Sequence, residues 1–307
     1  MGIICIVGPT AVGKTALALS LAKLLNGEII SCDSMQVYKG MDIGTAKPKR
    51  EELEAVKHHL IDIIEPSECF SCADYATLAR EAIHNIQKRG KTPIFCGGTG
   101  LYLDSVFSVP SFTETERDED YRRELNELAK EKGAEALHKM LEEIDMESAL
   151  ATHKNNVKRV IRALEIYKCT GVTKSEWDKR SRLAVPPYES TVFFLTMENR
   201  ELLYKKIEER VDIMLSEGLL EEARALYESN MLLPEYTASG AIGYKELLPY
   251  IKGECSLDDA VSQLKLATRH YAKRQLTWFN KHKEYHKICV DVKSPLDEAL
   301  RILNYEK

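Results

Sequence analysis

The sequence has no apolar run of the roughly 18 residues that a membrane-spanning helix needs, and its N-terminus lacks the charged lead of a secretory signal. It also has no repetitive or strongly biased segment. Hydrophobic residues make up 44% of the chain and charged residues 30%, which excludes collagen-like and wholly disordered proteins. These absences predict a globular, cytoplasmic protein that buries a sizeable core and has no membrane partner.

The eight cysteines show no metal-binding pattern. Only Cys69 and Cys72 have C-x2-C spacing, and no second cysteine pair follows at the spacing of a zinc site. Structural zinc needs four ligands, so one pair is not enough. We therefore interpret the cysteines as reduced, unpaired thiols.

A net excess of basic residues is missing as well. The 43 Lys and Arg residues against 48 Asp and Glu give a net charge of −5, and this total argues against a nucleic-acid partner. The distribution of charge points the other way. Between residues 263 and 287, seven basic residues and a single acid are interleaved with Tyr271, Trp278 and Phe279. This pattern suits contacts with phosphates and stacked bases, or alternatively a solvated helix face whose aromatic residues lie in the core.

Short apolar segments alternate with amphipathic segments and glycine turns in the first hundred residues. The expected strands are 3–7, 28–32 and 93–96, and the expected helices are 16–25 and 74–88. Strands that alternate with helices in this way form parallel sheets with crossover helices. We predict an α/β fold, with a P-loop NTPase-like core whose parallel sheet is flanked by helices.

A length of 307 residues predicts about two domains, and the composition shows where the second one begins. Residues 112–148 carry 13 acidic and 6 basic residues in helix-favouring sequence, whereas residues 153–182 carry 9 basic and 3 acidic residues. Residues 191–195 form an apolar run that we expect to return to the first sheet as a strand. The predicted domains are a catalytic core over 1–111 and 185–307 and a helical insertion over 112–184.

A phosphate-binding loop follows the first expected strand. The segment Gly8-Pro9-Thr10-Ala11-Val12-Gly13-Lys14-Thr15 fits the pattern G-x4-G-K-[ST] between a strand and a helix. Its glycines let successive backbone N–H groups face a diphosphate or triphosphate, with the helix N-terminus behind them. Lys14 supplies a positive charge and Thr15 a hydroxyl for Mg²⁺. No apolar strand ending in Asp lies in the central part of the chain, so an ATP-driven motor is disfavoured.

Two further polar side chains follow expected strands. Asp33 follows the second strand, and Thr99 lies in the glycine turn after the third. Because ligands of open α/β folds bind at the carboxyl ends of the strands, both residues should face the P-loop. By position alone, Asp33 could be a general base, a metal-shell ligand or a helix cap, and the glycine turn could be a plain strand-to-helix connection.

Several motifs along nearly the whole chain resemble, in order, those of the tRNA dimethylallyltransferases. They are Gly8-Pro9-Thr10-Ala11, Asp33-Ser34-Met35-Gln36-Val37-Tyr38, Ile43-Gly44-Thr45-Ala46-Lys47-Pro48, His58-His59-Leu60, Gly97-Gly98-Thr99-Gly100-Leu101-Tyr102, Arg159-Val160-Ile161-Arg162-Ala163-Leu164-Glu165, Ile242-Gly243-Tyr244-Lys245 and Ala272-Lys273-Arg274-Gln275-Leu276-Thr277-Trp278. The chain departs from the family pattern at Met146, where proline is usual, and at Asn156, where aspartate is usual. Neither departure touches the expected donor site.

The resemblance implies transfer of a dimethylallyl group from dimethylallyl diphosphate to N6 of the adenosine immediately 3′ of the anticodon, in tRNAs that read codons beginning with U. The P-loop would then hold the donor's diphosphate, assisted by Mg²⁺ at Thr15, instead of ATP. The resemblance further implies that Asp33 is the base, that Thr99 lies near the bridging oxygen, and that Lys14 and Arg210 contact the diphosphate. Its partner would be the anticodon stem-loop of tRNA, and we expect the protein to be a monomer.

The RNA-contacting residues are expected around the flipped adenosine, in the basic stretch of the insertion and in the C-terminal helices. They are Asp33, Ser34, Met35, Gln36, Thr99, Arg122, Lys158, Arg159, Arg162, Gly243, Tyr244, Lys245, Lys273, Arg274 and Gln275.

Three other functions remain compatible with a P-loop. An adenylate isopentenyltransferase would share the donor site but would have little use for the basic stretches. A small-molecule kinase would close an arginine lid over ATP, and a nucleotide-dependent RNA-binding protein would have no chemistry at Asp33. The arginines of such a lid would be Arg117, Arg122, Arg123, Arg180 and Arg182.

Overall fold

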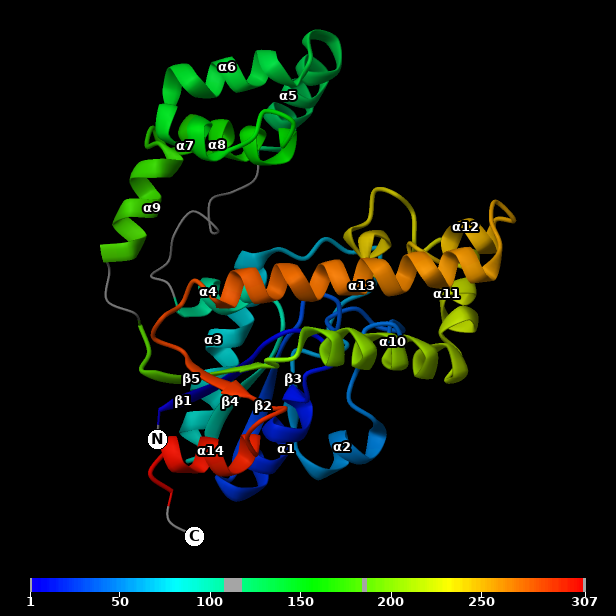
Figure 1. Ribbon diagram of the computed structural model, residues 1–307. Coiled ribbons are helices and arrows are strands. Elements are labelled where there is room, and N and C mark those ends of the chain that lie inside the picture. Colours follow the sequence, from blue (N-terminus) through cyan, green and yellow to red (C-terminus); the bar gives the residue numbers. More distant parts are fainter. Residues whose placement is uncertain (1, 108–117, 184–186, 306–307) are drawn as a thin grey trace. The chain divides into compact units, whose positions relative to one another are not determined.

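The computed structural model describes residues 2–107, 118–183 and 187–305, and in that part of the chain the strands form one six-stranded sheet (Figure 1). All neighbouring strands are parallel, in the order β3-β2-β4-β1-β5-β6. The strands are β1 (Ile3–Val7), β2 (Gly27–Cys32), β3 (His58–His59), β4 (Thr92–Gly97), β5 (Ser190–Thr196) and β6 (His286–Cys289). The predicted α/β fold with a helix-flanked parallel sheet is confirmed.

The central strands β1 and β4 are almost wholly buried, as expected where helices cover a parallel sheet on both faces. Every residue of β1 is buried. Helix α1 (Lys14–Leu24) contacts β1, β2 and β4, while α3 (Cys72–Lys88) contacts β2 and β4. Helix α3 begins at a capping box, in which Ser71 Oγ accepts from the Asp74 backbone N–H. The expected strand over 191–195 is also confirmed, because β5 pairs with β1.

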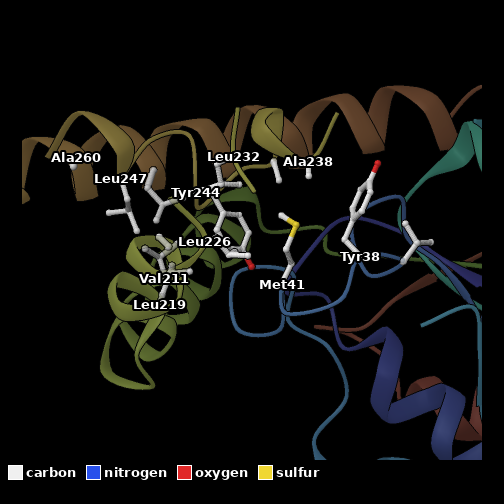
Figure 2. Packing of buried hydrophobic residues seen from close by; sticks show 14 residues of the cluster. Tyr38, Met41, Val211, Leu219, Leu226, Leu232, Ala238, Tyr244, Leu247 and Ala260 are labelled. Carbon is white, nitrogen blue, oxygen red and sulfur yellow. The ribbon is translucent and has the colours of Figure 1, made fainter. Parts of the chain in front are cut away.

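The C-terminal helices form the rest of the first compact unit, which spans Met1–Val106 and Tyr188–Lys307. Helix α13 (Leu257–Phe279) packs against α10 (Arg200–Ser216), and an ion pair of 2.6 Å joins Lys265 Nζ to Asp212 Oδ1 across them. Figure 2 shows the hydrophobic cluster built by these helices together with Tyr38 and Met41 from the N-terminal part of the chain. The remaining elements of this unit are α2 (Arg50–Ala55), α4 (Gly100–Phe107), α11 (Leu219–Glu228), η2 (Thr237–Gly240), α12 (Leu248–Ile251) and α14 (Pro295–Ile302).

The second compact unit spans Phe107–Pro187 and is helical. Leu125, Leu137, Leu141 and Leu164 are at most 1% exposed, so this unit has a hydrophobic core of its own. Its helices are α5 (Glu119–Lys132), α6 (Ala134–Ile144), α7 (Met146–Ala151), α8 (Val157–Thr170) and α9 (Lys174–Leu183). The domain boundaries expected at 111/112 and 184/185 lie outside the described residues. Among the described helices, none is both long and apolar enough to cross a membrane.

Candidate active site

The carboxyl ends of three neighbouring strands bring the predicted site residues to one edge of the sheet. Strand β4 lies between β1 and β2, and its last residue, Gly97, pairs with Val7 on one side and Cys32 on the other. The P-loop, Thr99 and Asp33 follow these strand ends, so all three emerge at the same edge. The two turns are also bonded to each other. The Ser34 backbone N–H donates to Thr99 Oγ1 at 3.1 Å.

Helix α1 begins at Lys14, so the last two residues of the P-loop motif lie in its first turn. No side chain caps the first turn of this helix, so the helix N-terminus can accept an anion. Lys14 Nζ donates to the Pro9 carbonyl oxygen at 2.7 Å, which holds the ammonium group over the loop. A cavity of about 340 Å³ lies against the loop and is also lined by Asp33 and Arg210. Burial lowers the pKa of Lys14 to about 8, so a bound anion would stabilise its charged form.

Gln275 of α13 joins the P-loop to the glycine turn after β4. Its Oε1 accepts from the Thr10 backbone N–H at 2.9 Å, and its Nε2 donates to the Gly98 carbonyl oxygen at 3.0 Å. The side chain is 5% exposed, and a Cβ on residue 98 would lie 2.0 Å from Nε2, so a larger residue there would displace the Gln275 amide. This geometry favours a positioning role for Gln275 over the RNA contact predicted from the sequence. No local sequence signal distinguishes the two roles.

Asp33 occupies the turn that follows β2. Its Oδ1 accepts from the Met35 backbone N–H at 2.9 Å. Burial raises the pKa of Asp33, although the Met35 N–H and the charge of Lys14 act against the increase. A raised pKa makes a carboxylate a better proton acceptor near neutral pH. No helix begins within residues 33–49, so the helix-cap interpretation of Asp33 is wrong.

A second cavity, of about 290 Å³, shares part of its wall with the P-loop cavity. One side of it is apolar, with Ile207 and Val211 of α10 and Leu264 of α13. Among the described residues, no hydrogen bond or ion pair engages Arg210, and burial lowers the pKa of its guanidinium. The residues that line both cavities are Thr10, Asp33, Thr45, Ala46, Arg210 and Tyr271. The sequence interpretation had assigned no role to Thr45 and Ala46.

The residues predicted to contact RNA in the first unit fall into two groups. Lys245, Lys273 and Arg274 are exposed, and the Arg274 guanidinium lies 5.7 Å from the centroid of the Tyr271 ring. Tyr244, in contrast, is fully buried in the hydrophobic cluster. Of the others in this unit, Asp33, Ser34, Met35, Gln36 and Thr99 are partly buried, and Gly243 and Gln275 are buried.

The predicted RNA-contacting residues of the second unit are also divided. Lys158 and Arg159 are exposed on α8. Arg122 and Arg162 both pair with the fully buried carboxylate of Glu165. The distances are 2.7 Å from Arg122 Nε to Oε1 and 2.5 Å from Arg162 Nη1 to Oε2. Both arginines therefore also serve to compensate a buried charge. Of the arginines proposed for a kinase lid, Arg117 and the side chain of Arg182 lie outside the described residues.

A metal ion would find few protein ligands here. Within the described ranges, no group of three or more His, Cys, Asp or Glu side chains could hold a metal. Thr15 lines the P-loop cavity beside Lys14. Mg²⁺ usually keeps several waters and binds through one or two protein oxygens together with substrate phosphates. The residues present fit a Mg²⁺ ion that is held mainly by a bound diphosphate.

Comparison with known proteins identifies the family. The IPP transferase family model matches residues 36–282. A tRNA dimethylallyltransferase of Geobacillus thermodenitrificans is 55% identical over 277 residues, which cover 90% of this chain and 87% of that protein.

Solved structures agree with this assignment. A full-length tRNA isopentenylpyrophosphate transferase from Bacillus halodurans is 46% identical, with a TM-score of 0.72 over 99% of this chain and 95% of that one. A eukaryotic dimethylallyltransferase described as acting on tRNA is 31% identical, with a TM-score of 0.84 over 98% of this chain and 78% of that one. The resemblance read from the motifs is thereby confirmed: the chain belongs to the IPP transferase family of tRNA dimethylallyltransferases.

Proposed function

We propose that this protein transfers a dimethylallyl group from dimethylallyl diphosphate to N6 of the adenosine immediately 3′ of the anticodon, position 37, in tRNAs that read codons beginning with U. One observation carries the proposal. The P-loop, the carboxylate of Asp33 and the hydroxyl of Thr99 meet where three adjacent strands end, beside the guanidinium of Arg210, which has no ion-pair partner among the described residues.

The reaction follows from this arrangement. The N6 nitrogen forms a bond to C1 of the donor while the bond from C1 to the bridging oxygen breaks, and diphosphate leaves with the electron pair. The P-loop N–H groups, Lys14 and Arg210 would stabilise the charge that develops on diphosphate. Asp33 would accept the N6 proton. The Thr99 hydroxyl, whose oxygen lies 3.4 Å from Ser34 Oγ, would turn its proton toward the leaving oxygen.

Mg²⁺ fits the same site. Thr15 would hold it through the hydroxyl oxygen, and the bound diphosphate would supply further ligands. The ion would add positive charge against the leaving group.

The RNA would contact exposed cations on both compact units. In the first unit these are Lys245, Lys273 and Arg274, and in the second they are Lys158 and Arg159. Arg122 and Arg162 would contribute through the part of each side chain that Glu165 leaves accessible. We propose that the core holds the chemistry, that the insertion helps to grip the anticodon arm, and that the protein acts as a cytoplasmic monomer.

A transfer assay tests the proposal. The protein is incubated with labelled dimethylallyl diphosphate and, separately, with an anticodon stem-loop, with AMP and with ATP. A stem-loop with guanosine in place of the target adenosine is the matched control. We expect label only in the adenosine stem-loop. Label in AMP alone would contradict RNA modification, and transfer of the γ-phosphate of ATP without prenylation would indicate a kinase.

A further inference from the structure

A single carboxylate outside the catalytic group holds the loop that borders the active-site cavities. Glu222 lies on α11 and accepts hydrogen bonds from three consecutive backbone N–H groups. The distances from its carboxylate oxygens to the nitrogens of Asp42, Ile43 and Gly44 are 3.0, 2.9 and 3.0 Å. The Tyr244 hydroxyl donates to Glu222 Oε1 at 2.6 Å. Glu222 thus occupies a nest of four donors, an arrangement that favours an anion.

The loop that Glu222 holds borders three cavities. Gly44, Thr45 and Ala46 line the 290 Å³ cavity, and Thr45 and Ala46 also line the P-loop cavity. Asp42 and Ile43 line a third cavity of about 520 Å³. A shift of this loop would therefore change the shape of the space in which donor and acceptor meet.

The loop is also connected to the strand that leads to Asp33. The carbonyl oxygens of Thr45 and Ala46 accept from Gln36 Nε2 at 3.1 and 3.2 Å. Gln36 Oε1 in turn accepts from Ser31 Oγ at 2.8 Å. Since Ser31 lies in β2 and Asp33 directly follows that strand, the position of the loop bears on the position of the proposed base.

Tight packing leaves the loop little freedom on its Tyr244 side. A Cβ on residue 44 would lie 2.6 Å from the Tyr244 ring, so the backbone of the loop rests directly on that side chain. Tyr244 is anchored in the hydrophobic cluster, where Figure 2 shows it near Leu226 and Leu247. The Glu222 carboxylate in turn ties the backbone N–H groups of residues 42–44 to α11.

We propose that Glu222 is a positioning residue for prenyl transfer. Its carboxylate holds residues 42–46 in place, and through the hydrogen bonds of Gln36 this loop helps to position Asp33 beside the acceptor nitrogen. The inference rests on the proposed function and deepens it. Among the described hydrogen bonds, none joins Glu222 to the P-loop, so we expect its loss to slow the chemical step more than it weakens diphosphate binding.

The test compares Glu222→Gln with Glu221→Gln, which changes the exposed neighbouring carboxylate on the same helix. An amide of the same shape keeps one acceptor oxygen but turns an NH₂ group toward the backbone N–H donors. Hydrogen exchange of residues 42–46 should become faster in Glu222→Gln only. Turnover with the stem-loop should fall on the order of 10- to 100-fold, as small misplacements of reacting groups do. Pyrophosphate affinity and the melting temperature should stay close to those of Glu221→Gln.

Each other outcome overturns the inference. Unchanged exchange at residues 42–46 would show that the carboxylate does not hold the loop, and faster exchange with unchanged turnover would show that the loop does not position the reaction. A loss of turnover that merely follows a lower melting temperature would indicate a structural role. Tyr244→Phe, which keeps the ring but removes one donor to Glu222, should give a smaller loss in the same direction. Failure of the proposed function is separate, because the unmodified protein would then not prenylate the stem-loop at all.

Discussion

Replacement of Gln275 by leucine should separate the positioning role seen in the structure from the RNA contact expected from the sequence. The leucine side chain has a similar volume but cannot bond to the Thr10 N–H or the Gly98 carbonyl. The P-loop and the glycine turn after β4 would then lose the two hydrogen bonds by which Gln275 joins them. We expect both a less stable core and a weaker diphosphate site.

The magnitude follows from the burial of the two abandoned groups. Gly98 is buried, so its unpaired carbonyl should cost about 2 kcal/mol, and Thr10 is partly buried, so its N–H should cost about 1 kcal/mol. Burial of the leucine offsets about 1 kcal/mol. The net loss of about 2 kcal/mol should lower the melting temperature by roughly 5 °C.

The matched control is Gln263→Leu, which makes the same change at an exposed position on the same helix. This control should stay within about 0.5 kcal/mol of the unmodified protein. Thermal unfolding, pyrophosphate binding and the KM for the anticodon stem-loop are measured for both variants. Weaker pyrophosphate binding in Gln275→Leu, with a KM for RNA like that of the control, is the expected result. The reasoning fails if stability and pyrophosphate binding match the control while the KM for RNA rises.

Three further predictions concern charged groups. Because burial raises the pKa of Asp33, single-turnover prenylation should decline with falling pH through a pKa above the ordinary value of 3.8. Asp33→Ala should reduce turnover far more than RNA affinity. An equal loss of turnover and RNA affinity would argue against a role as the base. Because burial lowers the pKa of Lys14 to about 8, pyrophosphate affinity should fall as pH rises through that value and be lost in Lys14→Ala; a pH-independent affinity would exclude the proposed contact. Burial opposes ionisation of Glu28, but hydrogen bonds from Lys91, His59 and Arg89 outweigh it and lower its pKa to about 2, against an ordinary 4.5. This carboxylate therefore stabilises the fold by about 3 kcal/mol above pH 4.5, and the contribution is lost as pH falls through about 2. Urea unfolding of Glu28→Gln at pH 7 and pH 2 checks this, and an equal deficit at both pH values would contradict it.

The elements of the core could be predicted because their signals are local. An apolar β-branched run such as residues 3–7 has few alternatives to a buried strand, and the pattern around Lys14 and Thr15 specifies a phosphate loop by short-range geometry. The predicted helix over 74–88 corresponds to α3. The structure begins this helix two residues earlier than the periodicity indicates, because a capping box at Ser71 sets its start.

The assignments of single side chains were less reliable where the partner is distant in sequence. Gln275 lies 265 residues from Thr10, and Glu222 lies 178 residues from Gly44, so no spacing rule connects them. The motif around Tyr244 does not show whether its hydroxyl contacts RNA or, as in the structure, the Glu222 carboxylate. The sequence by itself determined that a phosphate loop and an acid follow neighbouring parallel strands, because chain direction and local pattern suffice for that. Only the tertiary structure decided which polar groups of the C-terminal helices hold this site together, because their burial and partners depend on how distant segments pack.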